Sequence, residues 1–394
     1  MENIKQAVIL AAGEGERLRP FTALKPKVMI PVANKPILQF VVEALARSGI
    51  RNIVMVVGYR KEQVLDLFGS GERFDVDINY VFQEQQLGTA HALRQAKDAV
   101  GDRFLVLPGD NLIKAETLSS IIQAESATIL IKEQENVSKY GVVIARGGVV
   151  EAIEEKTKEA RSNMVNTGIY MFNREIFDFA EGEVDLTSAL GNMIAWGSPV
   201  AAQETWGSWL DVVYPWDILK VNDAALRTID ATAAGSIERG VILKGLVSVG
   251  RDTVIRSNTY IVGPVIIGDN CEIGPSVCIL PATSIGDNTV VSSFTQIENC
   301  AIGANVQIGP SSTIDDSVID HGSRLKGHLI ARSGEVEVKV EGECHRVEVG
   351  AMLGEYCNMD GGVNINPGVL VGNHTRVKAM KLLERDIPDG SLVV

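Results

Sequence analysis

The sequence predicts an α/β protein in which a doubly wound parallel sheet is followed by a β-helix. Two observations predict this fold class. Apolar strands alternate with amphipathic helices in the first part of the chain, and aliphatic residues recur every six positions in the second. The chain has 394 residues, of which 45% are hydrophobic and 22% charged. Such a composition is typical of a globular protein with more than one domain.

Short apolar runs and helical patterns alternate up to about residue 107. The expected strands are Gln6–Leu10, Ile53–Val57, Ile78–Phe82 and Phe104–Leu107, and the expected helices are Ile37–Leu45, Lys61–Phe68 and Thr89–Lys97. A series of strand, helix and strand produces a parallel sheet with helices on both faces. Ligands of such sheets bind beyond the carboxyl ends of the strands.

A six-residue period of aliphatic side chains begins at Val249 and predicts a β-helix with these side chains stacked inside. Its members are Val249, Ile255, Ile261, Ile267, Ile273, Ile279, Ile285, Val291 and Ile297, then Ile302, Ile308 and Ile314, and in a second register Leu353, Met359, Ile365, Val371 and Val377. The alternating run Glu335–Val340, within the interruption Lys326–Val349, predicts a projecting hairpin. The pattern resembles the left-handed β-helix of hexapeptide repeats.

A change of character at Pro215 marks the expected boundary between two domains. The residues from Pro215 to Arg239 combine a loosely amphipathic helix with an alanine-rich end. We therefore expect a first domain over residues 1–220, a linker helix over 221–239 and the β-helix over 240–394. No stretch is apolar and long enough for a membrane span, and the sequence enters a strand almost at once, so a cytoplasmic protein is expected.

The segment 10–36, LAAGEGERLRPFTALKPKVMIPVANKP, directly follows the apolar core of the first strand. Gly13 and Gly15 let the backbone turn sharply, so that its N–H groups can approach a phosphate. Five basic residues (Arg17, Arg19, Lys25, Lys27 and Lys35) stand against the two acids Glu14 and Glu16, an excess of 5 − 2 = +3 in a chain of net charge −13. A cationic segment in an acidic protein favours a small polyanion as ligand, rather than nucleic acid.

The glycine pattern differs from two better-known phosphate loops. Leu18 stands where the dinucleotide-binding fingerprint has its third glycine, and the segment lacks a P-loop. What remains, G-x-G-x-R-L-x-P-x-T, then P-K and P-V-x-x-K-P-I-L, resembles the signature of the sugar-1-phosphate nucleotidylyltransferases. The resemblance implies a Rossmann-like nucleotidylyltransferase domain, catalytic roles for Arg17 and Lys27, and nucleotide binding by Leu10, Ala11, Ala12, Gly13 and Gly15.

Two further motifs follow strands of the predicted sheet. Gln83, Gly88 and Thr89 match the family segment Q-x-x-x-x-G-T that holds the nucleotide base, and an amide can both donate to and accept from a base edge. Asp110 ends the strand–Gly–Asp motif, where an oxygen ligand suits Mg²⁺ beside phosphates. Asp211 resembles the second metal ligand in the family's W-x-D segment. Mg²⁺ is therefore the expected cofactor, held by Asp110 and Asp211.

Segments between these two aspartates resemble the sugar-binding segments of the family. They place Gly141, Glu155, Lys156 and Asn166 at the sugar and its phosphate. Carboxylate and amide groups suit a ligand rich in hydroxyls. Either Glu154 or Glu155 could face the sugar, and the position of Glu155 directly before the lysine favours Glu155.

The whole chain resembles the bifunctional sugar-1-phosphate nucleotidylyltransferase/acetyltransferases of the archaeal type, which make UDP-N-acetylglucosamine. The expected substrates are UTP or dTTP and a sugar-1-phosphate such as N-acetylglucosamine-1-phosphate or glucose-1-phosphate. Acetyl-CoA is expected only if the β-helix has the second activity, because the family's base histidine aligns with Pro310. The resemblance also implies a homotrimer through the β-helix. The alternative, a non-catalytic regulatory or assembly subunit, is disfavoured because Arg17, Lys27, Asp110 and Asp211 are all present.

Overall fold

The computed structural model describes residues 4–135, 137, 139–155, 161–340 and 343–394. They form two compact units. The first contains the residues up to Glu14, Pro26–Met29 and Ile37–Leu210, and the second contains Gly15–Lys25, Ile30–Pro36 and Asp211–Val394. The segment 10–36 therefore contributes to both units. Among the described residues, no helix has the length and apolar character needed to cross a membrane.

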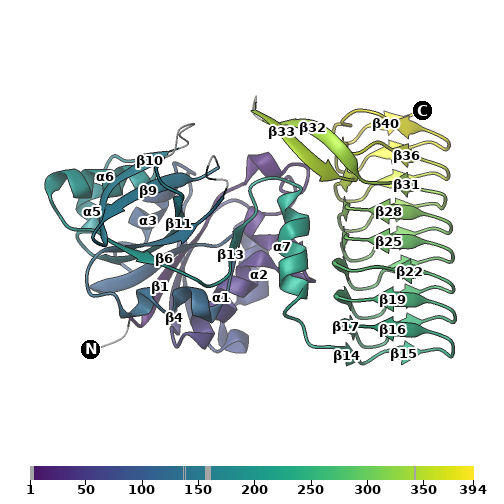
Figure 1. Ribbon diagram of the computed structural model, residues 1–394, viewed down its shortest axis with the longest axis horizontal. Coiled ribbons are helices and arrows are strands. Elements are labelled where there is room, and N and C mark those ends of the chain that lie inside the picture. The colour runs from purple at the N-terminus through teal and green to yellow at the C-terminus, as the bar shows by residue number, and fades with distance from the viewer. Residues whose placement is uncertain (1–3, 136, 138, 156–160, 341–342) are drawn as a thin grey trace. The chain divides into compact units, whose positions relative to one another are not determined.

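The first unit is built on a nine-stranded sheet of order β5-β4-β1-β6-β11-β8-β12-β10-β9 (Figure 1). Its strands are β1 Gln6–Ala11, β4 Asn52–Val57, β5 Asp77–Phe82, β6 Arg103–Pro108, β8 Thr128–Glu133, β9 Gly141–Arg146, β10 Val149–Glu155, β11 Met164–Asn173 and β12 Ala201–Glu204. β5, β4, β1 and β6 are parallel, as predicted. β11 runs antiparallel to β6 and β8, so the complete sheet is mixed. The predicted alternation of strands and helices ended before these later strands.

Helices cover both faces of this sheet, which confirms the doubly wound arrangement. In β1, Ala7 and Ile9 pack in one apolar cluster with α1 and α2, and Val8 packs in the other with α3, α5 and α6. This alternation follows from the two-residue side-chain period of a strand. The helices are α1 Ile37–Arg47, α2 Lys61–Phe68, α3 Thr89–Gln95, α4 Ala115–Leu118, α5 Ile176–Phe179 and α6 Leu186–Trp196, with short 3-10 turns η2 Lys27–Met29, η3 Glu72–Phe74 and η4 Ile121–Gln123.

The second unit contains a parallel β-helix of three sheets, whose strands stack as rungs in Figure 1. The first sheet contains β14 Thr232–Ala233, β17 Val247–Val249, β20 Val265–Ile267, β23 Thr283–Ile285, β26 Ala301–Ile302, β29 Val318–Ile319, β34 Met352–Leu353 and β37 Leu370–Val371. The second contains β15 Ser236–Ile237, β18 Val254–Ile255, β21 Glu272–Ile273, β24 Val290–Val291, β27 Gln307–Ile308, β30 Arg324–Leu325, β35 Asn358–Met359, β38 Arg376–Val377 and β40 Leu392–Val393. The third contains β16 Ile242–Lys244, β19 Tyr260–Val262, β22 Cys278–Ile279, β25 Gln296–Glu298, β28 Thr313–Asp315, β31 Ile330–Ala331, β36 Asn364–Ile365 and β39 Leu382–Leu383.

The pairing register explains the six-residue period. Val247 pairs with Val265, which is 265 − 247 = 18 residues or three periods later. Each turn of the β-helix thus places one aliphatic residue of every face directly over its equivalent. The predicted aliphatic residues of both registers all belong to one buried cluster, each at most 4% exposed. Burial of this stack supplies the core of the β-helix.

The interruption of the repeat is shorter than the sequence predicted. Val318 pairs with Met352, an offset of 352 − 318 = 34 residues, so 34 − 18 = 16 residues are inserted into one turn. These form the hairpin of β32 Gly334–Val340 and β33 Glu343–Val349, which projects from the β-helix in Figure 1. The repeat itself continues through Leu325 and Ala331, which lie inside the predicted interruption. An alanine in the aliphatic position hid this turn.

Helix α7, Asp217–Leu226, packs against the β-helix within the second unit. The fully buried side chain of Asn222 holds it there: its Nδ2 donates to Ala282 O over 3.1 Å, and its Oδ1 accepts from Ser284 Oγ over 2.9 Å. The first β-helix strands, β14 and β15, fall inside the range 221–239 assigned to a linker. That range therefore contains the end of α7 and the start of the β-helix, so it is no linker helix alone.

Candidate functional site

The carboxyl ends of β1, β4 and β6 form the floor of the candidate nucleotide site in the first unit. Gly109 N donates to Leu10 O over 2.9 Å, and Tyr59 N donates to Ala12 O over 3.1 Å. Ala11, the last residue of β1, and Ala12 are buried. A Cβ atom on Gly58 would lie 3.0 Å from Ala12 O. A small residue is therefore needed after β4, a requirement that the sequence signals only by a glycine directly following a strand.

The two glycines of the signature have different surroundings. A Cβ atom on Gly13 would meet no described atom within 4 Å, so the backbone there is open to a ligand. Gly15 belongs to the second unit and has φ 78°, which favours glycine. It precedes the 3-10 turn η1, Glu16–Leu18, that carries Arg17. Gly15 O accepts from Leu18 N and from Thr22 Oγ1, over 3.0 and 2.8 Å, and this closes the turn.

Lys27 and Asp110, predicted from separate motifs, form an ion pair in the first unit. Both side chains are about one-fifth exposed, at 22% and 20%. The approach depends on Gly109, because a Cβ atom there would lie 3.0 Å from Val28 Cγ1 and 3.1 Å from Leu38 Cδ1. The strand–Gly–Asp motif therefore needs its glycine to pack under the turn η2, which carries Lys27.

The predicted base-binding residues are fixed by contacts with one another. The buried Gln83 directs its Nε2 at Gly88 O over 3.1 Å and at His91 Nδ1 over 2.9 Å. Because a carbonyl can only accept, the atom of Gln83 that faces Gly88 is the NH₂ group. Gly88, with φ 93°, stands at the N-cap of α3, and a Cβ atom there would lie 2.1 Å from Val184 O. Thr89 Oγ1 accepts from the backbone of the segment that follows Val184.

Three predicted sugar-binding residues lie in a row across neighbouring strands. Gly141 of β9 pairs with Glu155 of β10, and a Cβ atom on Gly141 would lie 2.8 Å from Glu155 Oε1. Val142 pairs with Val165 of β11. Since these two strands are antiparallel, Gly141 comes opposite Asn166 one step further along. The sheet thus aligns a carboxylate, a glycine and an amide, although they are distant in sequence.

The two candidate glutamates differ in their partners. Glu154 is bound by the Arg161 guanidinium, whose Nε donates to Glu154 Oε1 over 2.8 Å. Glu155 instead lies beside Gly141, so the contacts support the choice of Glu155. Asn166 Nδ2 donates to Tyr170 Oη over 2.8 Å, and burial raises the pKa of Tyr170 above its ordinary value. Lys156, the other predicted sugar-phosphate residue, lies outside the described residues.

The buried indole of Trp209 connects three of the motifs. Its Nε1 donates to Asn111 Oδ1 over 3.3 Å and to Thr167 O over 3.1 Å, and its ring packs 5.3 Å from that of Tyr140. These contacts anchor β13, Trp209–Asp211, which pairs with β7, Asn111–Ile113. Sequence reasoning assigned no role to Trp209 or Asn111. A tryptophan two residues before the predicted metal ligand was the available signal.

The aspartates fit a magnesium ion by chemistry rather than by a preformed cage. The described residues contain no group of three or more His, Cys, Asp or Glu side chains that could hold a metal. Mg²⁺ is commonly held by one or two carboxylates, with substrate phosphates and water completing the shell. The partly exposed carboxylate of Asp110 suits this arrangement, and Asp211 supplies a second carboxylate at the end of β13.

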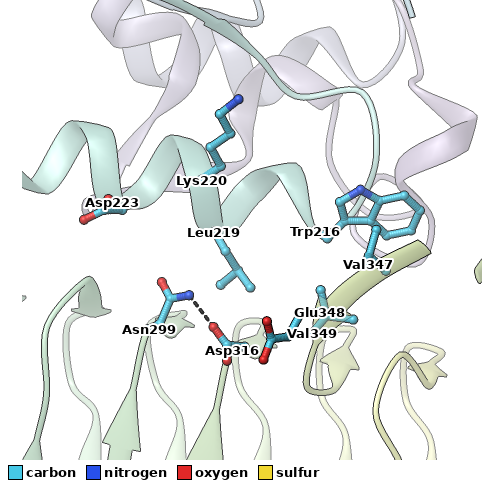
Figure 2. A pocket seen from close by; sticks show the side chains of 9 residues that line it. All are labelled: Trp216, Leu219, Lys220, Asp223, Asn299, Asp316, Val347, Glu348 and Val349. Atoms are coloured by element: carbon cyan, nitrogen blue, oxygen red, sulfur yellow. Dashed lines mark hydrogen bonds between the residues drawn. The ribbon is translucent and has the colours of Figure 1, made fainter. Parts of the chain in front are cut away.

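A cavity of about 340 Å³ lies within the second unit, between α7, two turns of the β-helix and the hairpin (Figure 2). The amide of Asn299 donates to the Asp316 carboxylate at its edge. The lining residues are Trp216, Leu219, Lys220, Asp223, Asn299, Asp316, Val347, Glu348 and Val349. None of these belongs to the predicted site, so this cavity is separate from the phosphate, base and sugar motifs.

Two family models match the sequence. The nucleotidyl transferase model matches residues 6–228, which include all the predicted site residues. The model of the GMPPB C-terminal domain matches residues 261–344, within the β-helix.

Relatives match almost the whole chain. The bifunctional protein GlmU of Methanocaldococcus jannaschii is 34% identical, over 98% of this chain and 97% of its own. A bifunctional sugar-1-phosphate nucleotidylyltransferase/acetyltransferase of Sulfurisphaera tokodaii is 32% identical, over 98% of each chain. A crystal structure of a UDP-glucose pyrophosphorylase complexed with UDP-glucose is 25% identical, with a TM-score of 0.50 over 57% of this chain and all of that one. The chain therefore belongs to the nucleotidyl transferase family, together with the bifunctional GlmU-type proteins that it matches over nearly its full length.

Proposed function

We propose that this protein is a sugar-1-phosphate nucleotidylyltransferase, which joins a nucleoside triphosphate to a sugar-1-phosphate and releases pyrophosphate. The observation that carries the proposal is the Lys27–Asp110 ion pair, which brings together the predicted catalytic lysine and the predicted metal ligand in a nucleotidyl transferase chain. The alternative of a non-catalytic subunit is less consistent with a chain that keeps these charged groups.

The reaction needs positioned charges more than a base. A phosphate oxygen of the sugar-1-phosphate attacks the α-phosphorus of the nucleotide, and the bond to the β-phosphate oxygen breaks. The attacking phosphate is already dianionic near neutral pH, because its second pKa is about 6. Lys27 holds this phosphate against the α-phosphate, and Arg17 neutralises the charge that develops on pyrophosphate. A magnesium ion, held by Asp110 and Asp211, supplies further neutralisation of the phosphates when bound.

The contacts of Gln83 favour uracil or thymine as the base. Both donors of its amide face atoms of the protein, namely Gly88 O and His91 Nδ1. Its Oε1 is then the atom suited to a base edge, and it can accept from the N3–H group of uracil or thymine. Cytosine presents an acceptor at that position. The proposed nucleotide is therefore UTP or dTTP, and the proposed sugar-1-phosphate is N-acetylglucosamine-1-phosphate or glucose-1-phosphate.

The proposal extends to the setting of the enzyme as the family resemblance implies it: a cytoplasmic homotrimer assembled through the β-helix. Acetyl-CoA enters only if the β-helix has a second activity. Pro310 occupies the position expected for the base histidine of that activity, and its carbonyl accepts from His328 N over 2.8 Å. Nucleotidyl transfer is therefore the single activity proposed.

Arg17→Ala and Lys27→Ala should each lower kcat for pyrophosphate release by about a hundredfold or more, because each removes charge stabilisation that peaks in the transition state. Arg19→Ala is the matched control, since Arg19 follows directly after the same turn but its side chain is exposed. Pyrophosphate release is measured with a coupled assay at saturating substrates. Unchanged turnover in both Arg17→Ala and Lys27→Ala would remove this assignment.

Asp110→Asn and Asp211→Asn should each abolish turnover at limiting magnesium, since an amide keeps the shape of the side chain but loses the charge that holds a divalent cation. The activity is titrated against magnesium for each variant and for the wild type. Thermal unfolding serves as the control for an intact fold. Full activity of either variant at limiting magnesium contradicts the proposed metal site.

Glu155→Gln should raise KM for the sugar-1-phosphate by about tenfold, because a charge-assisted hydrogen bond to a sugar hydroxyl is lost. Glu154→Gln is the control, since its carboxylate is bound by Arg161, and its KM should stay near the wild-type value. Steady-state kinetics with varied sugar-1-phosphate measures both. The reverse order of the two KM values would show that Glu154 is the sugar-binding residue.

A further inference from the structure

The β-helix holds part of the nucleotidylyltransferase signature. The segments Gly15–Lys25 and Ile30–Pro36 belong to the same compact unit as the β-helix, whereas Pro26–Met29 between them belongs to the first unit. Arg17 lies in the first of these segments, and Lys27 lies between the two. The contacts that hold the two segments are therefore contacts with residues more than 180 positions later in the chain.

Lys25 is the main anchor of the first segment. Its Nζ lies 2.7 Å and 2.8 Å from the two carboxylate oxygens of Asp320, and 2.8 Å from Glu355 Oε1. The side chains are largely buried, at 12% exposure for Lys25, 5% for Asp320 and 11% for Glu355. One ammonium group thus joins carboxylates on two successive turns of the β-helix.

The charge state of this cluster depends on Lys25. Burial alone lowers the pKa of Lys25, but attraction to Asp320 and Glu355 outweighs it, so the pKa lies above its ordinary value and the ammonium stays charged. Without the lysine, two buried carboxylates would face each other with no cation between them. Breaking a buried ion pair by removing one partner is strongly unfavourable, because the remaining charge is uncompensated.

A neutral contact supports the same segment on the next turn of the β-helix. Asn373 is buried, and its Nδ2 donates to Pro20 O over 3.0 Å. Its Oδ1 accepts from Glu355 N over 2.7 Å, so the amide is oriented by the turn that carries an anchor of Lys25. Leu18 and Phe21 of the segment are also buried, at 1% and 2% exposure. The segment that carries Arg17 is therefore fixed by charge, by hydrogen bonds and by packing.

The second segment has its own anchors on earlier turns. Asn34 Nδ2 donates to Ile285 O over 2.7 Å. Ala33 N donates to Oδ1 of Asn222, the buried side chain that also joins α7 to the β-helix, over 2.8 Å. The four residues Pro26–Met29, which include Lys27, are consequently bracketed by two segments that the β-helix holds.

We propose that the β-helix is a positioning element for nucleotidyl transfer, and that Lys25 is its main positioning residue because the Lys25–Asp320–Glu355 cluster orders the segment that carries Arg17. Lys25 touches neither substrate in this role. It acts by restricting the conformations of the turn around Arg17, so that the guanidinium is ordered before the nucleotide binds. The kinetic part of this inference rests on the proposed function.

The test compares Lys25→Met with Lys326→Met in the full-length chain. Lys326 forms a matched Lys–Asp ion pair on the β-helix, 2.8 Å from Asp360, but its side chain is 68% exposed and its partner is not a signature residue. Lys25→Met should lower kcat about tenfold or more, and Lys326→Met should leave kcat unchanged. Equal kcat values for wild type and Lys25→Met overturn the kinetic proposal.

A double-mutant cycle separates positioning from a loss of stability. If Lys25 acts through Arg17, then Arg17→Ala should cost much less kcat in the Lys25→Met background than in the wild type. A role in stability alone would lower the midpoint of thermal unfolding and leave the cost of Arg17→Ala the same. Adding Asp320→Asn and Glu355→Gln to Lys25→Met removes the uncompensated charges, and should recover part of the lost kcat. Additive effects of Lys25 and Arg17 overturn the proposal.

Hydrogen exchange tests the anchor without any assay of activity. The amides of Leu18, Arg19, Phe21 and Ala23 are hydrogen-bonded within the segment. Lys25→Met should speed their exchange, while the β-helix amides around Ile285 keep their protection. Unchanged exchange in residues 18–23 overturns the anchoring role. If the wild type releases no pyrophosphate but these amides lose protection in Lys25→Met, the proposed function fails and the anchor stands.

Discussion

Electrostatic attraction between one buried ammonium and two carboxylates holds the part of the signature that carries Arg17. Lys25, Asp320 and Glu355 come from positions 295 and more residues apart, and their side chains lie within 2.8 Å of one another. A catalytic arginine must be ordered before its substrate arrives, and a chain of small and basic residues cannot order itself. The β-helix thereby becomes part of the framework of the proposed site, in addition to any role in assembly.

The regular parts of the fold could be predicted because each has a simple period. The six-residue spacing of aliphatic residues specified the interior of the β-helix, and the resulting core is buried as expected. The prediction missed the turn at Ala331, since an alanine gives little hydrophobic signal. It also missed the antiparallel strand β11, because an apolar strand has the same side-chain alternation whichever way it runs.

The candidate site could be predicted residue by residue but not as an arrangement. Motifs identified Gly141, Glu155 and Asn166 one at a time, whereas the row that they form depends on the register of three strands. The role of Lys25 was hidden for a related reason. Among five basic residues of one segment, sequence alone could not tell which faces solvent or phosphate and which faces buried carboxylates. Long-range partners such as Asp320 carry no local signal.

The central claim is that the chain transfers a nucleotidyl group to a sugar-1-phosphate. The most direct measurement is pyrophosphate release by the full-length protein, with magnesium, from UTP or dTTP combined with each member of a panel of sugar-1-phosphates. The account predicts release that requires both substrates, with N-acetylglucosamine-1-phosphate or glucose-1-phosphate among the accepted sugars, and formation of the matching nucleotide sugar. Absence of pyrophosphate release from every combination, by protein shown to be folded, would contradict it.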